Sequence, residues 1–488
     1  MLLCGGSGKR LWPLSNEVRS KIFLKLLPVH AANAGSAEPG KESMIQRVCR
    51  QLEEAGLLTF SSVVALQSQA EITLHHIGNR IPFIAEPHRR GTFSAIALAA
   101  AYLHANQLAE LGETICVIPA DLYADVDFLS TLCQFPSVLA ASGAELALLG
   151  VKPMYPSTQF GYIVPKPQDQ ADSTSASASA SDAPSPSAAY AMVEHFTEKP
   201  DETTAARLIS RDALWNCGIF AFPLHFMLET MKRKGLPTDY DELLASYEQL
   251  PEQSFDVEVV EKATTVAVIP YQREWKDLGD WSVLPLYLGS DDTNVVGAGS
   301  VSEDSTDTHI VNELQQPIHV IGVPNVIVAA SADGILVANK QAANRIKSLR
   351  QDGQRRPMYG EERWGSYRIL DYPPTGQGPR TMTRLMELLP LKHTSYHAHQ
   401  QREECWTILS GTGELIMEAV KRPLQAGDMV HIPAGARHAI RASTALSYIE
   451  VQIGTELNEG DVLQYAAEWD SILRSCKQDG DNTTSSEA

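Results

Sequence analysis

The chain has 488 residues, of which 44% are hydrophobic and 20% are charged, and its formal net charge at pH 7 is −19. This length predicts two or three domains, and the composition is that of an ordinary globular protein. The negative charge argues against binding to nucleic acid or to an anionic membrane, although a local cationic pocket could still accept a phosphorylated substrate. No run of about 18 apolar residues occurs, so no membrane span is expected.

The cysteine pattern and the first residues of the chain indicate the cellular compartment in which the protein is expected to occur. The seven cysteines are scattered singly, without a CxxC pair, which is typical of a reducing environment and argues against a structural zinc site. Met1-Leu2-Leu3 leads directly into a glycine-rich stretch and does not have the form of a secretory signal. We therefore expect a soluble, cytoplasmic protein that begins with a very short strand.

The glycine-rich stretch is the first candidate site. It contains Gly5, Gly6 and Gly8. Glycines let main-chain N–H groups approach an anion closely. Arg10 and Lys21 add two cations, which suit a triphosphate and its leaving pyrophosphate. The spacing fits neither the Walker pattern nor the Rossmann fingerprint. On glycine content alone, an ordinary turn is an equal alternative.

Short buried strands then alternate with helices. We predict helices over residues 43–56 and roughly 92–108, and strands over 62–66, 81–87 and 114–121. This alternation predicts an α/β, Rossmann-like domain with a mostly parallel sheet and helices on both faces. Ligands bind such sheets at the carboxyl ends of the strands, where Asp121 lies. Asp121 could also be a simple turn former, and a magnesium site would need a second acid.

Composition divides the remainder of the chain. Residues 168–189 are mainly Ser, Ala, Pro and Asp, so we expect a disordered insertion inside a first domain that spans 1–290. Short Val/Ile strands between Asn, Asp and Gly predict a small β region over 291–350. Further short strands predict a β-barrel over 360–470. Residues 471–488 are expected to form a disordered tail.

The glycine-rich stretch also carries a family resemblance. GGSGKRLWPL, followed by Lys21-Ile22-Phe23-Leu24, resembles the GGxGxRLxPL…PK motif of the sugar-1-phosphate nucleotidyltransferases. Within this motif and just after it, Trp12 and Ser15 make the stretch resemble the mannose-1-phosphate guanylyltransferases in particular. The resemblance implies that the three glycines wrap the nucleotide phosphates and that Arg10 and Lys21 are catalytic. The chain departs from the family pattern at Lys9, Ser20, Ile22, Gly91, Phe93 and Leu122.

Further motifs resemble the same family in the same order. The resemblance implies nucleotide binding by Glu86 and Arg90, Mg²⁺ binding by Asp121 and Asp277, and sugar-phosphate binding by Gly161, Glu198, Lys199 and Asn216. Asp280 competes with Asp277, but it stands where the family has a small residue. Each motif alone has an ordinary alternative, such as a solvated Glu–Lys pair. As an ordered set they are specific.

The C-terminal barrel resembles a cupin. His397 and His399 are two residues apart, so they project from one face of a strand. Glu404 and His438 complete a set of four ligands for a divalent transition metal. The segment is similar to the isomerase half of the type II phosphomannose isomerase/guanylyltransferases. An alignment without a gap places Gln401 at a ligand position, so a metal-free cupin is the alternative.

The resemblance covers nearly the whole chain. It implies transfer of GMP from GTP to mannose 1-phosphate, which yields GDP-mannose for polysaccharide biosynthesis and releases pyrophosphate. Two alternatives stay open. One is a bifunctional enzyme that also interconverts mannose 6-phosphate and fructose 6-phosphate at the cupin. The other is a non-catalytic sugar-nucleotide-binding regulator. The sequence is compatible with a homo-oligomer and does not specify the oligomeric state.

Overall fold

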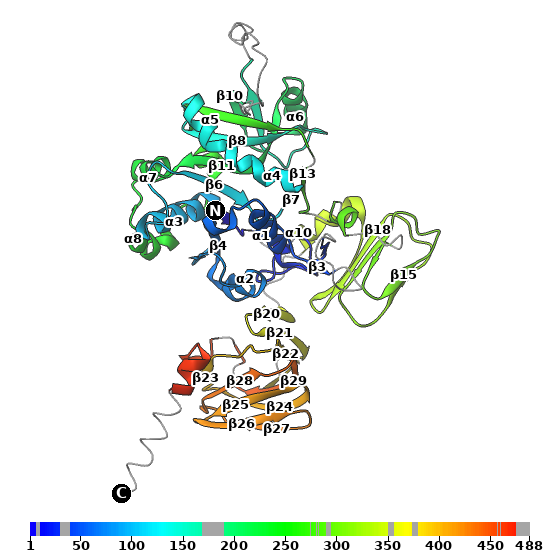
Figure 1. The fold of residues 1–488 in the computed structure, drawn as a ribbon. Coiled ribbons are helices and arrows are strands. Elements are labelled where there is room, and N and C mark those ends of the chain that lie inside the picture. Colours follow the sequence, from blue (N-terminus) through cyan, green and yellow to red (C-terminus); the bar gives the residue numbers. More distant parts are fainter. Residues whose placement is uncertain are drawn as a thin grey trace, which may run out of the picture. The chain divides into compact units, whose positions relative to one another are not determined.

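The chain divides into two compact units in a computed structural model (Figure 1). Met1–Ser7 and Ser20–Gly289 form the first, and Gly8–Arg19 and Ser290–Ala488 form the second. The structure describes residues 1–5, 10–29, 40–167, 190–273, 275–279, 281, 283–288, 294–349, 356–372, 379–455, 457–458 and 460–474. Gly6, Gly8 and the expected insertion at 168–189 lie outside these residues. No described helix is long and apolar enough to cross a membrane.

The first unit is built on a sheet that has nine strands within the described residues. Their order is β5-β4-β1-β6-β11-β8-β12-β10-β9. The strands are β1 (Leu2–Leu3), β4 (Val63–Leu66), β5 (Phe83–Glu86), β6 (Thr114–Pro119), β8 (Leu146–Val151), β9 (Tyr162–Pro165), β10 (Ala191–Thr197), β11 (Leu214–Pro223) and β12 (Val266–Tyr271). Two small pairs lie outside this sheet, β2 (Leu27–Pro28) with β3 (Lys41–Glu42), and β7 (Leu122–Ala124) with β13 (Trp275–Asp277).

The α/β class and the strands predicted before residue 121 are confirmed, but the sheet is mixed. The neighbours from β5 to β6 are parallel. By contrast, β11 is antiparallel to both β6 and β8, and β10 is antiparallel to β9 and β12. Antiparallel strands can pair without a crossover helix. Helices also lie between β10 and β11 and between β11 and β12, so the alternation of strands and helices did not by itself determine strand direction.

Helices cover this sheet. They are α1 (Met44–Glu54), α2 (Ala70–Ile77), α3 (Gly91–Ala105), α4 (Val126–Ser130), α5 (Phe135–Ser142), α6 (Glu202–Ile209), α7 (Leu224–Arg233), α8 (Tyr240–Ala245) and α9 (Phe255–Glu258). The predicted helix at 43–56 begins with a capping box between Ser43 and Gln46. In α3 the run from Phe93 to Ala101 is buried, because its small alanines let α7, α8 and α9 pack closely.

The second unit contains the predicted β region and the barrel. The β region comprises β14 (Val295–Val296), β15 (Gly299–Val301), β16 (His309–Asn312), β17 (Ile318–Val320), β18 (Val326–Ser331), β19 (Gly334–Asn339) and α10 (Ile346–Leu349). The barrel strands are β20 (Tyr359–Glu362), β21 (Gly365–Asp371), β22 (Arg380–Leu388), β23 (Tyr396–Ala398), β24 (Arg402–Ser410), β25 (Thr412–Met417), β26 (Val420–Gln425), β27 (Met429–Ile432), β28 (His438–Ala442), β29 (Leu446–Gly454) and β30 (Leu463–Ala466).

Two antiparallel sheets form the barrel, in the orders β20-β21-β22-β29-β24-β27 and β26-β25-β28-β23-β30. Trp406, Tyr448 and Ile440 belong to the apolar core that they enclose. A helix over 469–474 follows, and it packs Trp469 and Ile472 against Tyr396. Residues 471–474 therefore belong to the folded part, and our assignment of them to a disordered tail was wrong, because two apolar side chains of this turn reach the barrel.

The segment after the glycine loop is anchored within the second unit. Trp12 packs against Gly334, where a Cβ atom would lie 2.7 Å from its ring. Ser331 Oγ donates a hydrogen bond to the Pro13 carbonyl at 2.6 Å, and Asn16 Nδ2 donates to Asp333 Oδ2 at 2.9 Å. These three contacts hold the segment that follows the predicted catalytic Arg10 against the β region.

Arg19 ends the same segment and is buried among acids. Its two terminal nitrogens donate to Glu313 at 2.9 and 3.0 Å, and its Nε lies 3.3 Å from Glu361 Oε1. The guanidinium also stacks on the Tyr359 ring, 4.9 Å from its centroid. One cation therefore satisfies an acid of the β region and a fully buried acid of the first barrel strand.

We predict that Arg19→Met lowers the free energy of unfolding by about 3 kcal/mol, because it leaves the buried Glu361 carboxylate without its cation. Urea denaturation of the full chain would measure the loss. The double variant Arg19→Met with Glu361→Gln should recover part of it, since it also removes the uncompensated charge. Additive losses in the double variant would contradict the ion-pair explanation.

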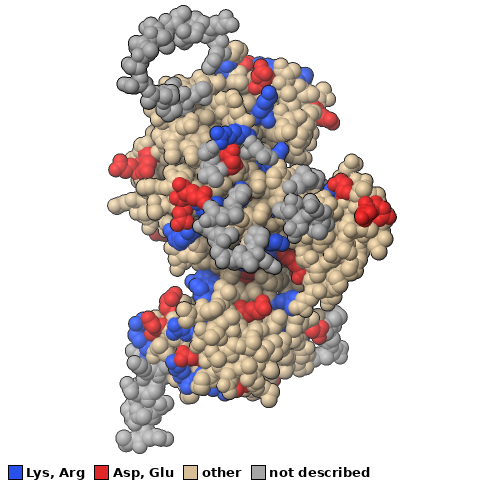
Figure 2. All heavy atoms as spheres, turned by 45° about the vertical axis from the view of Figure 1, so that its right-hand side comes forward, with Lys and Arg blue, Asp and Glu red and all other residues tan. Residues whose placement is uncertain are grey.

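Charges of both signs occur on one face of the molecule (Figure 2). On the face shown in Figure 2, Lys and Arg side chains lie among Asp and Glu side chains. Interspersed charges of both signs give a weaker long-range field than one gathered patch would. A site for a phosphorylated substrate therefore depends on local groups.

Candidate active site and metal centre

The carboxyl ends of β1 and β6 meet at the centre of the first sheet. Leu3 lies opposite Pro119, and the Ala120 N–H donates to the Leu3 carbonyl at 3.0 Å. Gly5 and Asp121 therefore leave the sheet at the same edge. Lys21 begins a short 3-10 turn, and its Nζ lies 2.7 Å from Asp121 Oδ2. The predicted catalytic lysine and the predicted metal-binding aspartate thus form an ion pair.

The second predicted magnesium ligand reaches this edge through a small antiparallel pair. Within it, Asp277 of β13 lies opposite Leu122 of β7, the residue that follows Asp121. Asp121 and Asp277 together would supply the one or two carboxylates that Mg²⁺ takes from protein. The side chain of Asp277 and the competing Asp280 lie outside the described residues. Shared magnesium binding therefore stays a prediction.

Glu86 has internal partners. It ends β5 with 8% of its surface exposed. Its carboxylate accepts hydrogen bonds from the Tyr247 hydroxyl at 3.0 Å and from the Arg90 N–H at 3.2 Å. Burial raises the pKa of this carboxyl. Glu86 therefore shapes the turn that leads to Arg90, and nucleotide contact by either residue stays a prediction.

Arg90 has an N–H donor that is not used within the described residues, and close packing explains why a glycine follows it. The buried Arg90 Nε has no hydrogen-bond partner among the described residues. Gly91 has φ of 80°, and a Cβ atom there would lie 2.2 Å from the carbonyl oxygen of Gln253. The family's asparagine could not occupy this position. The departure at Gly91 is explained by packing against residue 253.

The four predicted sugar-phosphate residues are linked by contacts. A Cβ atom at Gly161 would lie 2.5 Å from Glu198 Oε2, so this position has no room for a side chain. The Asn216 N–H donates to the Gly161 carbonyl at 2.8 Å. Lys199 forms an ion pair with Glu198 and has φ of 44°. Side-chain-bearing residues seldom adopt that conformation, and such strain is frequent at functional sites.

Sequence reasoning missed Asp256. This half-buried residue belongs to α9, and its Oδ1 accepts a hydrogen bond from Asn216 Nδ2 at 2.7 Å. Burial and the facing charge of Glu198 raise its pKa to about 6. An aspartate two residues after the capping Ser254 is unremarkable in sequence, because acids are common in the first turn of a helix. Only its contact with Asn216 sets it apart.

Aromatic residues next to these positions line a cavity of about 590 Å³. The Phe160 ring centroid lies 4.9 Å from that of Trp215 and 5.4 Å from that of Trp275. The Nε1 atoms of both indoles are buried without a hydrogen-bond partner among the described residues. Such rings offer apolar faces on which another ring can stack. The cavity can therefore hold a ligand ring.

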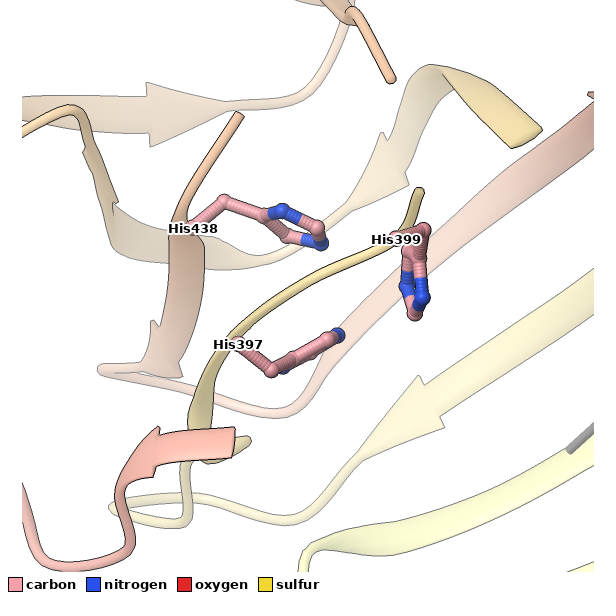
Figure 3. Close-up of side chains that lie close together, drawn as sticks. All are labelled: His397, His399 and His438. Carbon is pink, nitrogen blue, oxygen red and sulfur yellow. The ribbon is translucent and has the colours of Figure 1, made fainter. Parts of the chain in front are cut away.

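The barrel gathers the three predicted histidine ligands (Figure 3). One ring nitrogen each of His397, His399 and His438 lie within 4.8 Å of one another. His397 of β23 is directly opposite His438 of β28. Glu404 of β24 completes the group, because its oxygens lie 3.1 Å from His399 Nε2 and 3.6 Å from His438 Nε2.

Backbone carbonyls orient the three imidazoles. Each Nδ1 lies within hydrogen-bond distance of a carbonyl oxygen, of Ser395 at 2.8 Å, Asp461 at 2.5 Å and Ala436 at 3.0 Å. A carbonyl can only accept, so each Nδ1 carries the proton and each Nε2 keeps a lone pair. The buried Nε2 of His438 has no hydrogen-bond partner in the part of the chain that the structure describes. The donor set fits a divalent transition metal.

The charge state of the centre also suits a metal. Burial, and then the neighbouring histidines, lower the pKa of His397 to about 3. Burial acts to raise the pKa of Glu404, but the positive charge around it, including that of Arg384, outweighs burial and holds that pKa well below its ordinary value. Neutral imidazole and ionised carboxylate are the forms that bind metals. Trp406 and Gln452 each donate a hydrogen bond to Glu404 at 3.1 Å.

The structure resolves the ambiguity between His397 and Gln401. Gln401 is exposed, and the backbone N–H groups of Gln400 and Gln401 donate to the Asp461 carboxylate at 2.8 and 3.2 Å. The two additional residues thus form a bend that leaves His397 in the centre. Arg402 Nη2 lies 3.2 Å from His399 Nε2. A divalent cation bound there would replace the guanidinium as the partner of that lone pair.

We predict that the purified protein binds a divalent transition metal such as Zn²⁺ or Mn²⁺ and that His397→Gln reduces the bound metal at least tenfold, since it removes one of four ligands. Elemental analysis after dialysis would measure it. Gln401→Ala is the matched control and should keep the wild-type metal content. Loss of metal from the control alone would restore the ungapped assignment.

Comparisons with known proteins agree with this division of the chain. The nucleotidyl transferase family model matches residues 1–285, and the cupin domain model matches residues 384–452. The chain is 28% identical over 500 residues to alginate biosynthesis protein AlgA of Pseudomonas putida, with 95% of each chain covered. It is 27% identical over 508 residues to mannose-1-phosphate guanylyltransferase RfbM of Salmonella typhimurium, covering 96% of this chain and 98% of the relative.

A solved structure is similar in fold over most of the chain. It is described as mannose-1-phosphate geranyltransferase from Thermus thermophilus. The TM-score is 0.55 and the sequence identity 26%, and the similarity covers 71% of this chain and 96% of that chain.

Proposed function

The chain belongs to the nucleotidyl transferase family, and on this basis we propose that it transfers GMP from GTP to mannose 1-phosphate. The products are GDP-mannose and pyrophosphate. The observation that supports this best is the Lys21–Asp121 ion pair beside the start of the glycine loop, at the carboxyl edge of the sheet. Relatives named mannose-1-phosphate guanylyltransferase match the chain along almost its whole length.

The mechanism is a single in-line displacement. A phosphate oxygen of mannose 1-phosphate forms a bond to the α-phosphorus of GTP, and the bond from that phosphorus to the bridging oxygen breaks, so pyrophosphate leaves. Asp121 and Asp277 would hold Mg²⁺, which when bound offsets phosphate charge. Arg10 and Lys21 stabilise the negative charge that develops on the leaving side. Lys199 holds the attacking phosphate.

The sugar side of the site is arranged by contacts within the first unit. An ion pair with Glu198 holds Lys199 in place, and Gly161 leaves room for the Glu198 carboxylate. Two residues that line the aromatic cavity, Phe160 and Trp215, are sequence neighbours of Gly161 and Asn216. A hexose ring could stack its C–H face on an aromatic ring there.

Pyrophosphate release tests the proposal directly. With purified protein, Mg²⁺ and mannose 1-phosphate, we expect release with GTP and not with ATP, CTP or UTP. A coupled phosphate assay with pyrophosphatase would measure it. Release with none of the four would contradict the proposal and favour a non-catalytic sugar-nucleotide-binding regulator.

We predict that Lys199→Ala raises the KM for mannose 1-phosphate roughly tenfold or more but leaves the KM for GTP unchanged, because it removes one charge-assisted hydrogen bond to the sugar phosphate. Steady-state kinetics with each substrate varied in turn would measure both constants. Lys232→Ala, at an exposed position of α7, is the matched control. Equal increases in the two KM values would contradict the role given to Lys199.

The cupin supports a second candidate function, interconversion of mannose 6-phosphate and fructose 6-phosphate. The observation that favours it is a cavity of about 280 Å³ into which the metal ligands and two arginines, Arg384 and Arg402, all open. Arginines suit phosphate recognition. A coupled isomerase assay on the metal-loaded protein would test it. His399→Gln should abolish isomerisation and leave pyrophosphate release intact, and isomerase activity that survives would exclude this site.

A further inference from the structure

Asn216 has less to offer a ligand than its sequence motif implies. With 7% of its surface exposed, its side-chain oxygen accepts a hydrogen bond from the Gly218 N–H at 3.0 Å. Its side-chain nitrogen donates to Asp256 Oδ1 at 2.7 Å. Half of the hydrogen-bonding capacity of each amide atom is therefore used internally. These two bonds fix the orientation of the Asn216 amide. The amide in turn orients the Asp256 carboxylate to which it donates.

Asp256 faces the same cluster from another element. Its carboxylate receives the Asn216 bond on one oxygen and lies close enough to Glu198 and Lys199 for both charges to influence it. Two facing carboxylates repel each other unless donors lie between them. Neighbouring hydroxyl groups of a sugar are such donors, and the charge of Lys199 suits a phosphate. The cluster thus matches a phosphorylated hexose in donors, acceptors and charge.

The backbone that carries Asp256 is held rigidly. The Phe255 N–H donates to Thr92 Oγ1 at 2.8 Å, and the Phe255 ring is fully buried against Phe220 and Phe222. The Gln253 carbonyl occupies the place of a side chain at Gly91. The first turn of α9 is thereby attached to the first turn of α3. A side chain on such a support holds its geometry when a ligand binds.

We propose that Asp256 is a further sugar-binding residue, whose carboxylate accepts a hydrogen bond from a hydroxyl group of the hexose 1-phosphate, and that Asn216 is a positioning residue that orients this carboxylate. This inference rests on the proposed function and adds a residue to the same site. It assigns to Asp256 a contact with the sugar of the kind that the family resemblance assigned to Asn216.

The charge of Asp256 gives the proposal a pH signature. Burial and Glu198 raise its pKa to about 6, while Lys199 and Asn216 oppose the shift. The carboxylate therefore accepts strongly above that pH and weakly below it. The phosphate of the substrate also titrates near pH 6. The informative quantity is thus the difference between wild type and a variant that cannot ionise at this position.

The thermal stability of the Asp256→Asn variant distinguishes an effect on sugar binding from an effect on folding. Asp256 has a higher pKa in the folded chain than the ordinary value of 3.8, so its ionisation opposes folding as the pH rises through this range. Asp256→Asn removes the buried charge and keeps the shape of the side chain. Its melting temperature at neutral pH should therefore equal or exceed that of the wild type.

The experiment is steady-state kinetics of full-length wild type and Asp256→Asn between about pH 5 and 8, where the group titrates. We expect the variant to raise the KM for mannose 1-phosphate roughly 10- to 100-fold at the upper pH, since one hydrogen bond to a charged acceptor is lost. The KM for GTP should not change, and the ratio of the two mannose 1-phosphate KM values should fall as the pH falls. Glu252→Gln, an exposed carboxylate of the same segment, is the matched control.

The outcomes distinguish this inference from the proposed function. An unchanged KM for mannose 1-phosphate, or equal increases for both substrates with a lower melting temperature, would overturn the role of Asp256. If the wild type is inactive with every nucleotide, the proposed function fails. Calorimetric titration with mannose 1-phosphate and with glucose 1-phosphate then decides the role of Asp256 alone. Weaker binding by Asp256→Asn supports it, and binding equal to wild type or absent from both proteins rejects it.

Discussion

The candidate active site depends on one constraint, the parallel pairing of a two-residue strand at the centre of a sheet. Leu2 and Leu3 lie between β4 and β6, and the Met1 amino group donates to the Cys116 carbonyl. Parallel strands end at a common edge, so the glycine loop after β1 and Asp121 after β6 emerge together. A central strand is also among the most rigid parts of a domain. Lys21 begins a short 3-10 turn, and its Nζ lies 2.7 Å from Asp121 Oδ2.

Close backbone approach determines the sugar side of the site. At Gly161 the carboxylate of Glu198 occupies the space of a side chain, and at Gly91 the carbonyl of Gln253 does so. Each contact brings together segments that are far apart in sequence and leaves no slack between them. Acidic and amide groups that would otherwise be solvated are therefore held within one cluster, where burial raises the pKa of Asp256. The geometry of two glycines thus controls the electrostatics of the site.

The cupin centre is organised by hydrogen bonds that lie outside the ligand set. Three backbone carbonyls fix the histidine tautomers, and Trp406 and Gln452 hold the Glu404 carboxylate. Arg402 bridges His399 and Glu404. Such surrounding partners prepare a metal site before any metal arrives. The same unit holds Arg19 between Glu313 and Glu361, so it depends on buried charge both at the cupin and at the segment that follows the glycine loop.

His397 lies in β23, but that strand ends at Ala398, so the predicted placement of both histidines on one strand holds for His397 alone. The sequence by itself determined the order of the motifs, the α/β class, and the early strands and helices, because each follows from local periodicity or from neighbours in the chain. It could not decide between His397 and Gln401, since that depended on a bend held by Asp461. It contained no sign of Asp256 or of the acids around Arg19. Those groups lie far from their partners in sequence, and only the tertiary structure brings them within hydrogen-bond distance. The mixed sheet was decided in the same way, because strand direction depends on which distant edges pair and not on the pattern within any one strand.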